Sequence, residues 1–237
     1  MAVDNKARIW AVMGQSGTGK GVWTKRELKR LKPTRILILD PQDEYGAFAA
    51  PVYTAGDMAR AVIAGGAGRS FKVRYVFPKI CTQAHFERIF DLACQLAYGA
   101  RNCVFLVEEL SNFTTPSHAP PLWRRMCNSG RHEGVHIIGC SQFPAQIDKS
   151  FLSNATLVHC GYLGEAPHRK AVALKMDIKP ELIRDLLDLH YIEWHREGRK
   201  LIRGEINWAS GRVSEKPLLP GDEKTNPKRP PKPPNSA

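Results

Sequence analysis

Short apolar runs alternate along the chain with segments in which apolar residues recur every three or four positions. The runs predict β-strands and the segments of helical period predict α-helices. The expected strands span residues 7–13, 35–39, 71–77, 103–107, 134–140 and 155–160. The expected helices span residues 20–31, 57–64, 83–98, 121–129, 166–175 and 180–189, and a hairpin turns near residues 197–198.

The strands are continuously apolar rather than alternating, and helices separate most of them. A strand with no polar face is typical of a sheet that is covered on both sides. We therefore expect an α/β fold with a mostly parallel sheet and helices on both faces. The 237 residues suffice for one large domain, which we assign to residues 1–215.

The last 22 residues, 216–237, differ in composition from the rest of the chain. They hold 7 of the 17 prolines and five basic residues, and they have no aromatic residue. Such a segment cannot bury enough apolar surface to offset the entropy of ordering it. We expect a basic, proline-rich, disordered tail, which either tethers a partner or nucleic acid or is passive.

One phosphate-binding sequence connects the first expected strand to the first expected helix. It matches the P-loop pattern G-x-x-x-x-G-K, and such a loop needs glycines so that backbone N–H groups can surround phosphate oxygens. The lysine adds a positive charge, and the helix adds its positive N-terminal end. We therefore expect ATP to bind here. The residues concerned are Gly14, Gln15, Ser16, Gly17, Thr18, Gly19, Lys20 and Gly21.

Gly21 stands where P-loops usually carry the Ser or Thr that binds Mg²⁺. Three explanations are open: the hydroxyl of Thr18, Ser16 or Thr24 replaces it, a water fills the position, or the dependence on metal is weak. Mg²⁺ keeps several waters readily, so we favour a water with a carboxylate behind it.

Two acidic residues follow the apolar run at 104–107, as in a Walker B motif. We expect Glu108 to hold Mg²⁺ or its water, and Glu109 to orient and deprotonate the attacking water. Gln142 follows the strand at 134–140, so its amide should lie at the same edge of the sheet and sense the γ-phosphate or this water.

The chain is basic, with 35 Lys and Arg against 23 Asp and Glu and a net charge of +12. This excess favours a polyanionic partner. Two clusters could contact DNA phosphates without reading sequence. One lies in the first helix and the other near the last hairpin: Lys25, Arg26, Lys29, Arg30 and Lys32, and Arg196, Arg199, Lys200 and Arg203.

Other features indicate a cytoplasmic protein without a membrane span. No apolar run approaches 18 residues, and the first six residues have no apolar stretch of the kind found in a secretory signal. The six cysteines form no C-x-x-C pair, so we expect small buried side chains in a reducing compartment.

Taken together, these blocks resemble the FtsK–HerA superfamily of DNA-pumping ATPases, and most of all the small genome-packaging ATPases of tailless, membrane-containing viruses such as tectiviruses. The resemblance rests on the P-loop, on residues 36–45 with their Asp-Pro and Glu-Tyr pairs, on the two acids at 108–109, and on the block at 131–144. The glycine at 21 and the glutamate at 108 depart from the family pattern.

The resemblance implies a RecA-like core, assembly as a homo-oligomeric ring, and ATP-driven translocation or packaging of double-stranded DNA. It also implies an arginine that reaches the neighbouring subunit's γ-phosphate, for which Arg131 is our choice, with Arg124 and Arg125 behind it. A packaging role would further imply capsid or virion-vertex partners, and a place in the host cytoplasm or the virion.

Two alternatives remain open. One is an adaptor that binds nucleotide without hydrolysing it and recruits DNA or a capsid through its basic tail. The other is a small-molecule kinase, although a Ser-Gln strand tip does not suit an acceptor site. DNA-stimulated ATP turnover would separate the motor from both.

Overall fold

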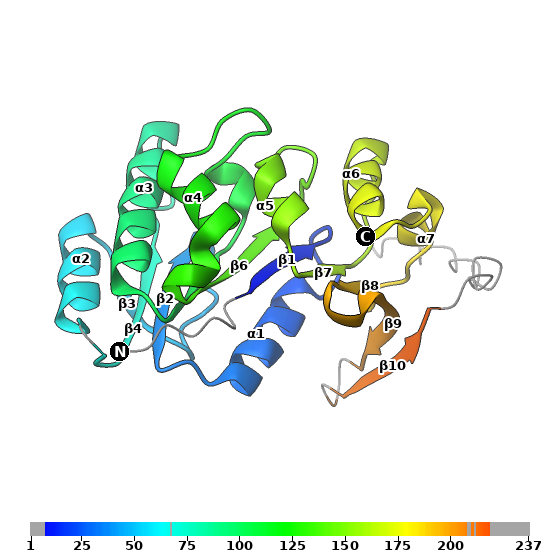
Figure 1. Ribbon diagram of the computed structural model, residues 1–237, viewed down its shortest axis with the longest axis horizontal. Coiled ribbons are helices and arrows are strands. Elements are labelled where there is room, and N and C mark those ends of the chain that lie inside the picture. Colours follow the sequence, from blue (N-terminus) through cyan, green and yellow to red (C-terminus); the bar gives the residue numbers. More distant parts are fainter. Residues whose placement is uncertain (1–7, 67, 208–209, 211, 219–237) are drawn as a thin grey trace, which may run out of the picture.

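The computed structural model describes residues 8–66, 68–207, 210 and 212–218 (Figure 1). The strands are β1 Ile9–Met13, β2 Arg35–Asp40, β3 Ala50–Val52, β4 Phe71–Val76, β5 Cys103–Val107, β6 Val135–Ser141, β7 Leu157–Cys160, β8 His190–His195, β9 Lys200–Ile206 and β10 Val213–Pro217. The α-helices are α1 Lys20–Leu31, α2 Ala55–Ala64, α3 Gln83–Ala100, α4 Pro121–Ser129, α5 Lys149–Asn154, α6 Ala166–Met176 and α7 Pro180–Arg184. Short 3-10 turns are η1 Leu110–Asn112, η2 Gly130–Glu133 and η3 Glu197–Arg199.

All ten strands form a single sheet in the order β10-β9-β8-β7-β1-β6-β5-β2-β4-β3. The seven strands from β7 to β3 pair in parallel, and β8, β9 and β10 extend the sheet as antiparallel strands. The predicted α/β fold with a mostly parallel sheet is therefore confirmed. Because β1 lies between β6 and β7, the loop that leaves β1 emerges among the carboxyl ends of its neighbours, where α/β proteins place their ligands.

Helices cover both faces of the sheet, unequally. Helices α2 to α7 lie over one face, and α1 lies on the other together with the segment after β2 (Figure 1). Alternate residues of a strand point to opposite faces, so in β1 Met13 enters the larger core whereas Trp10 and Val12 enter the smaller one. In the smaller core Trp10 meets Trp23 of α1 edge to face, with ring centroids 5.8 Å apart.

The structure corrects several sequence-based boundaries. Strand β3, helix α5 and strand β10 were not predicted, because β3 and α5 are short and β10 is largely exposed and has no apolar run. The helix expected over residues 180–189 ends at Arg184, and the chain then turns into β8 with Leu189 at a φ of +63°. Leu189 accepts a hydrogen bond from the backbone N–H of Ile206, so pairing with β9 overrides the local helical preference.

The domain boundary that we expected at residue 216 falls inside a strand. Lys216 and Pro217 complete β10 and lie opposite Arg203 and Ile202 of β9. A proline is tolerated there because β10 is the edge strand of the sheet. Residues 219–237 of the predicted tail lie outside the described residues.

Candidate functional site

The loop at residues 14–19 has the conformation that the P-loop pattern predicts. Gly14 has a φ of +150°, and a Cβ on it would lie 2.6 Å from Oγ1 of Thr18, so a larger residue cannot stand there. Gly19 has a φ of +97° at the start of α1, and no side chain of the described residues caps this end of the helix. The first backbone N–H groups of α1 are therefore free to bind an anion.

Lys20 lies inside this loop and is 8% exposed. Its Nζ donates to the backbone carbonyl of Gln15 at 3.2 Å, across the hollow of the loop. The loop itself is fixed to the neighbouring strand ends, since Gly14 donates to the carbonyl of Ser141 and Gln15 to that of Tyr162. The ammonium group of Lys20 is thus held inside the loop, and backbone hydrogen bonds to two neighbouring strand ends hold the loop in place.

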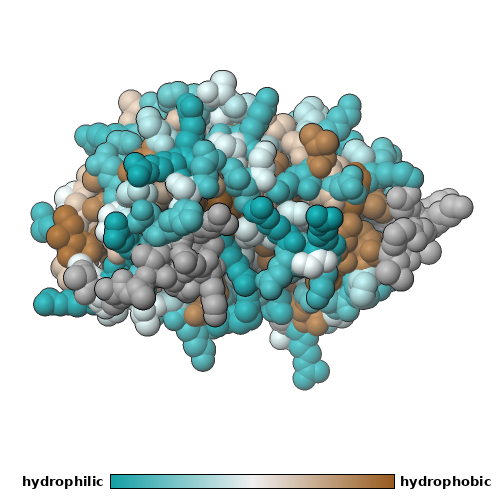
Figure 2. Space-filling model, in the orientation of Figure 1, coloured by the Kyte–Doolittle hydropathy of each residue, from teal (hydrophilic) through white to brown (hydrophobic). Residues whose placement is uncertain are grey.

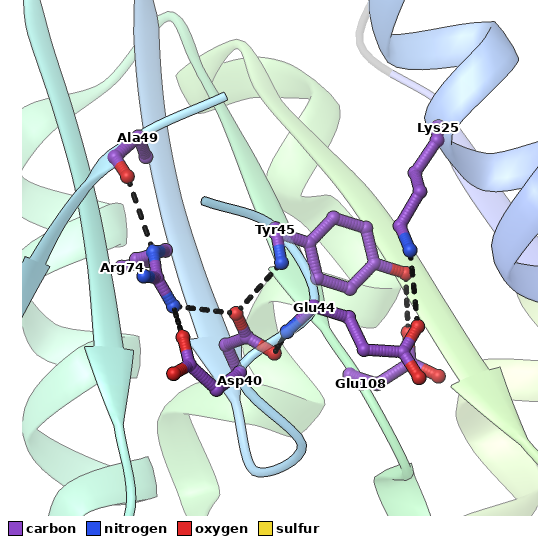
Figure 3. Close-up of polar contacts among 8 residues, drawn as sticks. Lys25, Asp40, Glu44, Tyr45, Ala49, Arg74 and Glu108 are labelled. Carbon is purple, nitrogen blue, oxygen red and sulfur yellow. Dashed lines mark hydrogen bonds and ion pairs between the residues drawn. The ribbon is translucent and has the colours of Figure 1, made fainter. Parts of the chain in front are cut away.

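Glu108 lies at the tip of β5 with its carboxyl group buried. Burial raises its pKa, and the hydroxyl of Tyr45, which donates to Oε2 at 2.6 Å, together with Cys140 and the charge of Lys20 works in the opposite direction (Figure 3). Burial and the nearby carboxylates raise the pKa of Tyr45 well above its usual value. The first acid of the predicted Walker B pair is therefore held by Tyr45, from the segment after β2.

Glu109 turns away from Glu108 because its backbone has a φ of +55°, in the left-handed region. Its carboxylate accepts hydrogen bonds from the hydroxyls of Ser111 (2.6 Å) and Ser141 (3.0 Å) and from the backbone N–H of Gln142 (3.3 Å to each oxygen). The structure thus brings Glu109 and Gln142 together, as the shared sheet edge predicts. The contact with Glu109 uses the backbone N–H of Gln142, so the role expected of its side-chain amide stays a prediction.

Arg131 is not brought to this edge within the chain. It lies in η2 just before β6, which begins at Val135, so its backbone is at the amino end of the strand, opposite the P-loop. Arg124 donates to a backbone carbonyl close to it in sequence, and Arg125 lies over an aromatic ring with 5.3 Å to the centroid. The role expected of Arg131 towards a neighbouring subunit stays a prediction.

The oxygen donors around the loop fit a magnesium–nucleotide complex. Among the described residues there is no cluster of three or more His, Cys, Asp or Glu that could hold a metal. Mg²⁺ does not need one in such sites, since one or two carboxylates, phosphates and waters suffice. Glu108 supplies a hard carboxylate beside the loop. Thr24 is fully buried and donates to a carbonyl one turn earlier in α1, so it is not available as the missing hydroxyl, whereas Ser16 is exposed.

The basic stripe predicted on α1 is partly neutralised within the chain. Lys25 pairs with Glu44 at 3.1 Å, and Arg26 and Arg30 both pair with the buried Glu27. Fewer of these charges are therefore available to DNA than the sequence suggests.

All six cysteines are free thiols, and five of them are buried, as expected. Burial raises the pKa of Cys103 to about 12, so this thiol is unreactive at neutral pH.

Sequence reasoning assigned no role to a network that follows β2. Asp40 is fully buried and accepts the backbone N–H groups of Glu44 and Tyr45, each at 3.0 Å, and Arg74 of β4 pairs with the same carboxylate at 3.0 Å (Figure 3). The Asp-Pro and Glu-Tyr pairs in the sequence marked this segment, but the contact between Asp40 and Arg74 forms only because β4 lies beside β2.

Similarity to known proteins agrees with this geometry. No family model matches the chain. The chain is 26% identical over 175 residues to protein P9 of Pseudoalteromonas phage PM2, covering 74% of this chain and 78% of that protein. Among solved structures, it is similar to the genome packaging NTPase B204 from Sulfolobus turreted icosahedral virus 2 in complex with AMPPCP, with a TM-score of 0.65, 16% identity, and coverage of 90% of this chain and 99% of the other.

It is also similar to VirB4 of Thermoanaerobacter pseudethanolicus, with a TM-score of 0.66, 12% identity, and coverage of 89% and 92% of the two chains. The chain shares the fold of these proteins, a RecA-like α/β core. These similarities confirm the resemblance to the FtsK–HerA ATPases and their viral packaging members that the sequence motifs indicated.

The face of the molecule that Figure 2 shows is largely hydrophilic, with small, separate hydrophobic areas. Within the described ranges, no helix combines the length and apolar character needed to cross a bilayer.

Proposed function

We propose that this protein is an ATPase that translocates or packages double-stranded DNA, acting as a homo-oligomeric ring in the cytoplasm of a host cell or in a virion. The observation that carries the proposal is a loop that holds Lys20 inside it, beside the strand ends from which Glu108 and Glu109 extend. The similarity to the genome packaging NTPase B204 supports the packaging role, and capsid or vertex proteins would then be partners.

Binding of the nucleotide follows from the loop. The backbone N–H groups of residues 16, 17 and 19–21 and the ammonium group of Lys20 would surround the β- and γ-phosphates. Mg²⁺, held by Glu108 directly or through a water, would neutralise charge on these phosphates. Lys20 already neutralises part of the negative charge around Glu108, which prepares the pair for an anionic ligand and its cation.

Hydrolysis requires a group that orients and deprotonates water. Glu109 can do this because its carboxylate is held in one place by Ser111 and Ser141, and by the backbone of Gln142. Gln142 would sense the γ-phosphate from the same strand tip. Arg131 of a neighbouring subunit would stabilise the charge that develops on the transferred phosphoryl group.

DNA would be held by phosphate contacts from the basic surface, which carry no sequence information. Lys29 of α1 and Lys32 just after it form no ion pair among the described residues, so they are candidates for this contact. Duplex binding should therefore fall steeply with salt and depend little on sequence.

The alternative functions differ in whether ATP is hydrolysed and in whether DNA changes the rate of ATP turnover. A non-hydrolysing adaptor would bind ATP and DNA without consuming ATP, and a small-molecule kinase would turn over ATP without regard to DNA. The decisive measurement is the rate of phosphate release by purified protein with and without duplex DNA, together with ATP binding by calorimetry.

Two variants test the roles proposed for Lys20 and Glu109. Lys20→Ala should abolish ATP binding, because it removes the cation inside the loop. Glu109→Gln should keep ATP binding but lose about 10²-fold or more of turnover, a typical effect of removing a general base. Wild-type affinity in Lys20→Ala would refute the P-loop assignment, and full activity of Glu109→Gln combined with an inactive Glu108→Gln would mean that the two acids have exchanged roles.

A mixing experiment tests Arg131. The variant Arg131→Ala should bind ATP normally and hydrolyse it poorly, by roughly 10³-fold or more. Mixed with inactive Lys20→Ala, it can form sites with an intact loop from one subunit and an intact arginine from the other. Partial recovery of ATP turnover is expected. Subunit exchange that labelling verifies, with activity remaining at zero, would show that Arg131 does not act on a neighbour.

A further inference from the structure

The first turn of α1 leaves a space that a carboxylate fills. Gly21 has no side chain, and a Cβ built there would lie 3.3 Å from Oε2 of Glu44, the nearest atom of the described residues outside the helix. In P-loops with Ser or Thr at this position, the hydroxyl that binds Mg²⁺ is attached to that Cβ. A carboxylate oxygen therefore lies beside the place from which the missing hydroxyl would extend.

Glu44 is directed to this place by its backbone. Asp40 at the end of β2 accepts the N–H of Glu44 through Oδ1 and that of Tyr45 through Oδ2, and Arg74 holds the same carboxylate. As a result, two consecutive side chains reach the site: Glu44 lies next to α1, and Tyr45 donates to Glu108 (Figure 3).

The charges near Glu44 are suited to the reversible binding of a cation. Glu44 pairs with Lys25 at 3.1 Å, and their side chains are 50% and 34% exposed, so the pair is accessible and weak. Tyr45, which follows Glu44 in the chain, donates to Oε2 of Glu108 at 2.6 Å, so the segment that carries Glu44 also contacts the second carboxylate. Two carboxylates beside phosphates form a donor set that Mg²⁺ accepts.

We propose that Glu44 replaces the missing P-loop hydroxyl and holds, directly or through a water, the Mg²⁺ that accompanies the nucleotide. Lys25 neutralises Glu44 when the metal is absent. The glycine at position 21 belongs to the same arrangement, because a side chain there would press on the carboxylate. This inference rests on the proposed nucleotide-binding function.

The test compares Glu44→Ala with Lys25→Ala, because the two variants break the same ion pair and only the first removes the carboxylate. The affinity for AMPPCP is measured by calorimetry in Mg²⁺ and in EDTA, and Mn²⁺ binding to the protein–AMPPCP complex is measured by electron paramagnetic resonance. Glu44→Ala should weaken Mn²⁺ binding and the gain in affinity due to Mg²⁺ by about 10- to 100-fold. Its affinity in EDTA should not fall, and Lys25→Ala should keep the gain.

A double variant replaces the lost carboxylate oxygen with a hydroxyl oxygen at position 21. In Gly21→Ser/Glu44→Ala, the serine hydroxyl takes its usual position in a space cleared by the shorter side chain, so at least part of the Mg²⁺-dependent affinity should return. Equal losses in Glu44→Ala and Lys25→Ala, or unchanged Mn²⁺ binding in Glu44→Ala, would overturn the inference alone. A wild-type protein that binds AMPPCP neither in Mg²⁺ nor in EDTA would overturn the proposed function and this inference with it.

Discussion

Replacing Asp40 by asparagine should destabilise the protein far more than a neutral substitution of similar shape normally does. The Asp40 carboxylate is fully buried and serves three donors: the backbone N–H groups of Glu44 and Tyr45, and Nη1 of Arg74. Asparagine has a single acceptor oxygen, so its NH₂ group must face at least one of these donors. The change also leaves Arg74, which is 7% exposed, without its buried counter-ion.

The size of the effect follows from burial. Removing one partner of a buried ion pair costs about 3–5 kcal/mol, because the other charge stays in a poorly solvated place. Arg74 keeps a second partner, Asp43, but the Asp43 side chain is 59% exposed, and such a pair contributes at most about 1 kcal/mol. We therefore expect Asp40→Asn to lower the free energy of unfolding by about 3 kcal/mol, and the control Asp43→Asn to lower it by less than about 1 kcal/mol.

Urea denaturation measures both values, provided that the slope of free energy against urea is the same in each variant. The double variant Asp40→Asn/Arg74→Met should lose less than the sum of the two single losses, because removing both charges removes the unpaired one. If Asp40→Asn and Asp43→Asn differ by less than about 0.5 kcal/mol, then Asp40 does not organise this loop and the reasoning is wrong.

Gly204→Ala should cost about 1–3 kcal/mol of unfolding free energy by thermal or urea denaturation, because its Cβ would lie 2.2 Å from Cζ of Tyr191; an unchanged stability would contradict this contact. Gly99→Ala in α3 should instead stabilise the protein by about 0.5–1 kcal/mol, since nothing lies within 4 Å of the added Cβ, and a loss of stability would contradict that environment. Burial acts to raise the pKa of Glu193, but hydrogen bonds with two histidine side chains outweigh burial and lower that pKa to about 2 from 4.5. Its stabilising contribution is therefore complete well above pH 4.5 and is lost as the pH falls towards 2, so the gap in unfolding free energy between wild type and Glu193→Gln should narrow as the pH falls from about 5 towards 2; a gap that does not depend on pH would contradict this origin.

The sequence alone determined the features that depend on neighbouring residues. Apolar runs and helical periods predicted the parallel strands and the longer helices, because burial imposes those periods on contiguous segments. The P-loop was recognisable because phosphate binding needs glycines and a lysine at fixed spacing within one turn. The shared sheet edge of Glu109 and Gln142 also followed from the sequence, since parallel strands end at the same edge.

Only the tertiary structure decided which of these groups touch. The pairing of Asp40 with Arg74 depends on β4 lying beside β2, and the position of Glu44 next to Gly21 depends on how the segment after β2 crosses α1. Neither relation has a periodicity, because the partners lie 34 and 23 residues apart and are joined through the strand order. The same reason explains why the helix predicted to continue to residue 189 ends early: a contact with β9, distant in sequence, outweighed the preference of the local segment.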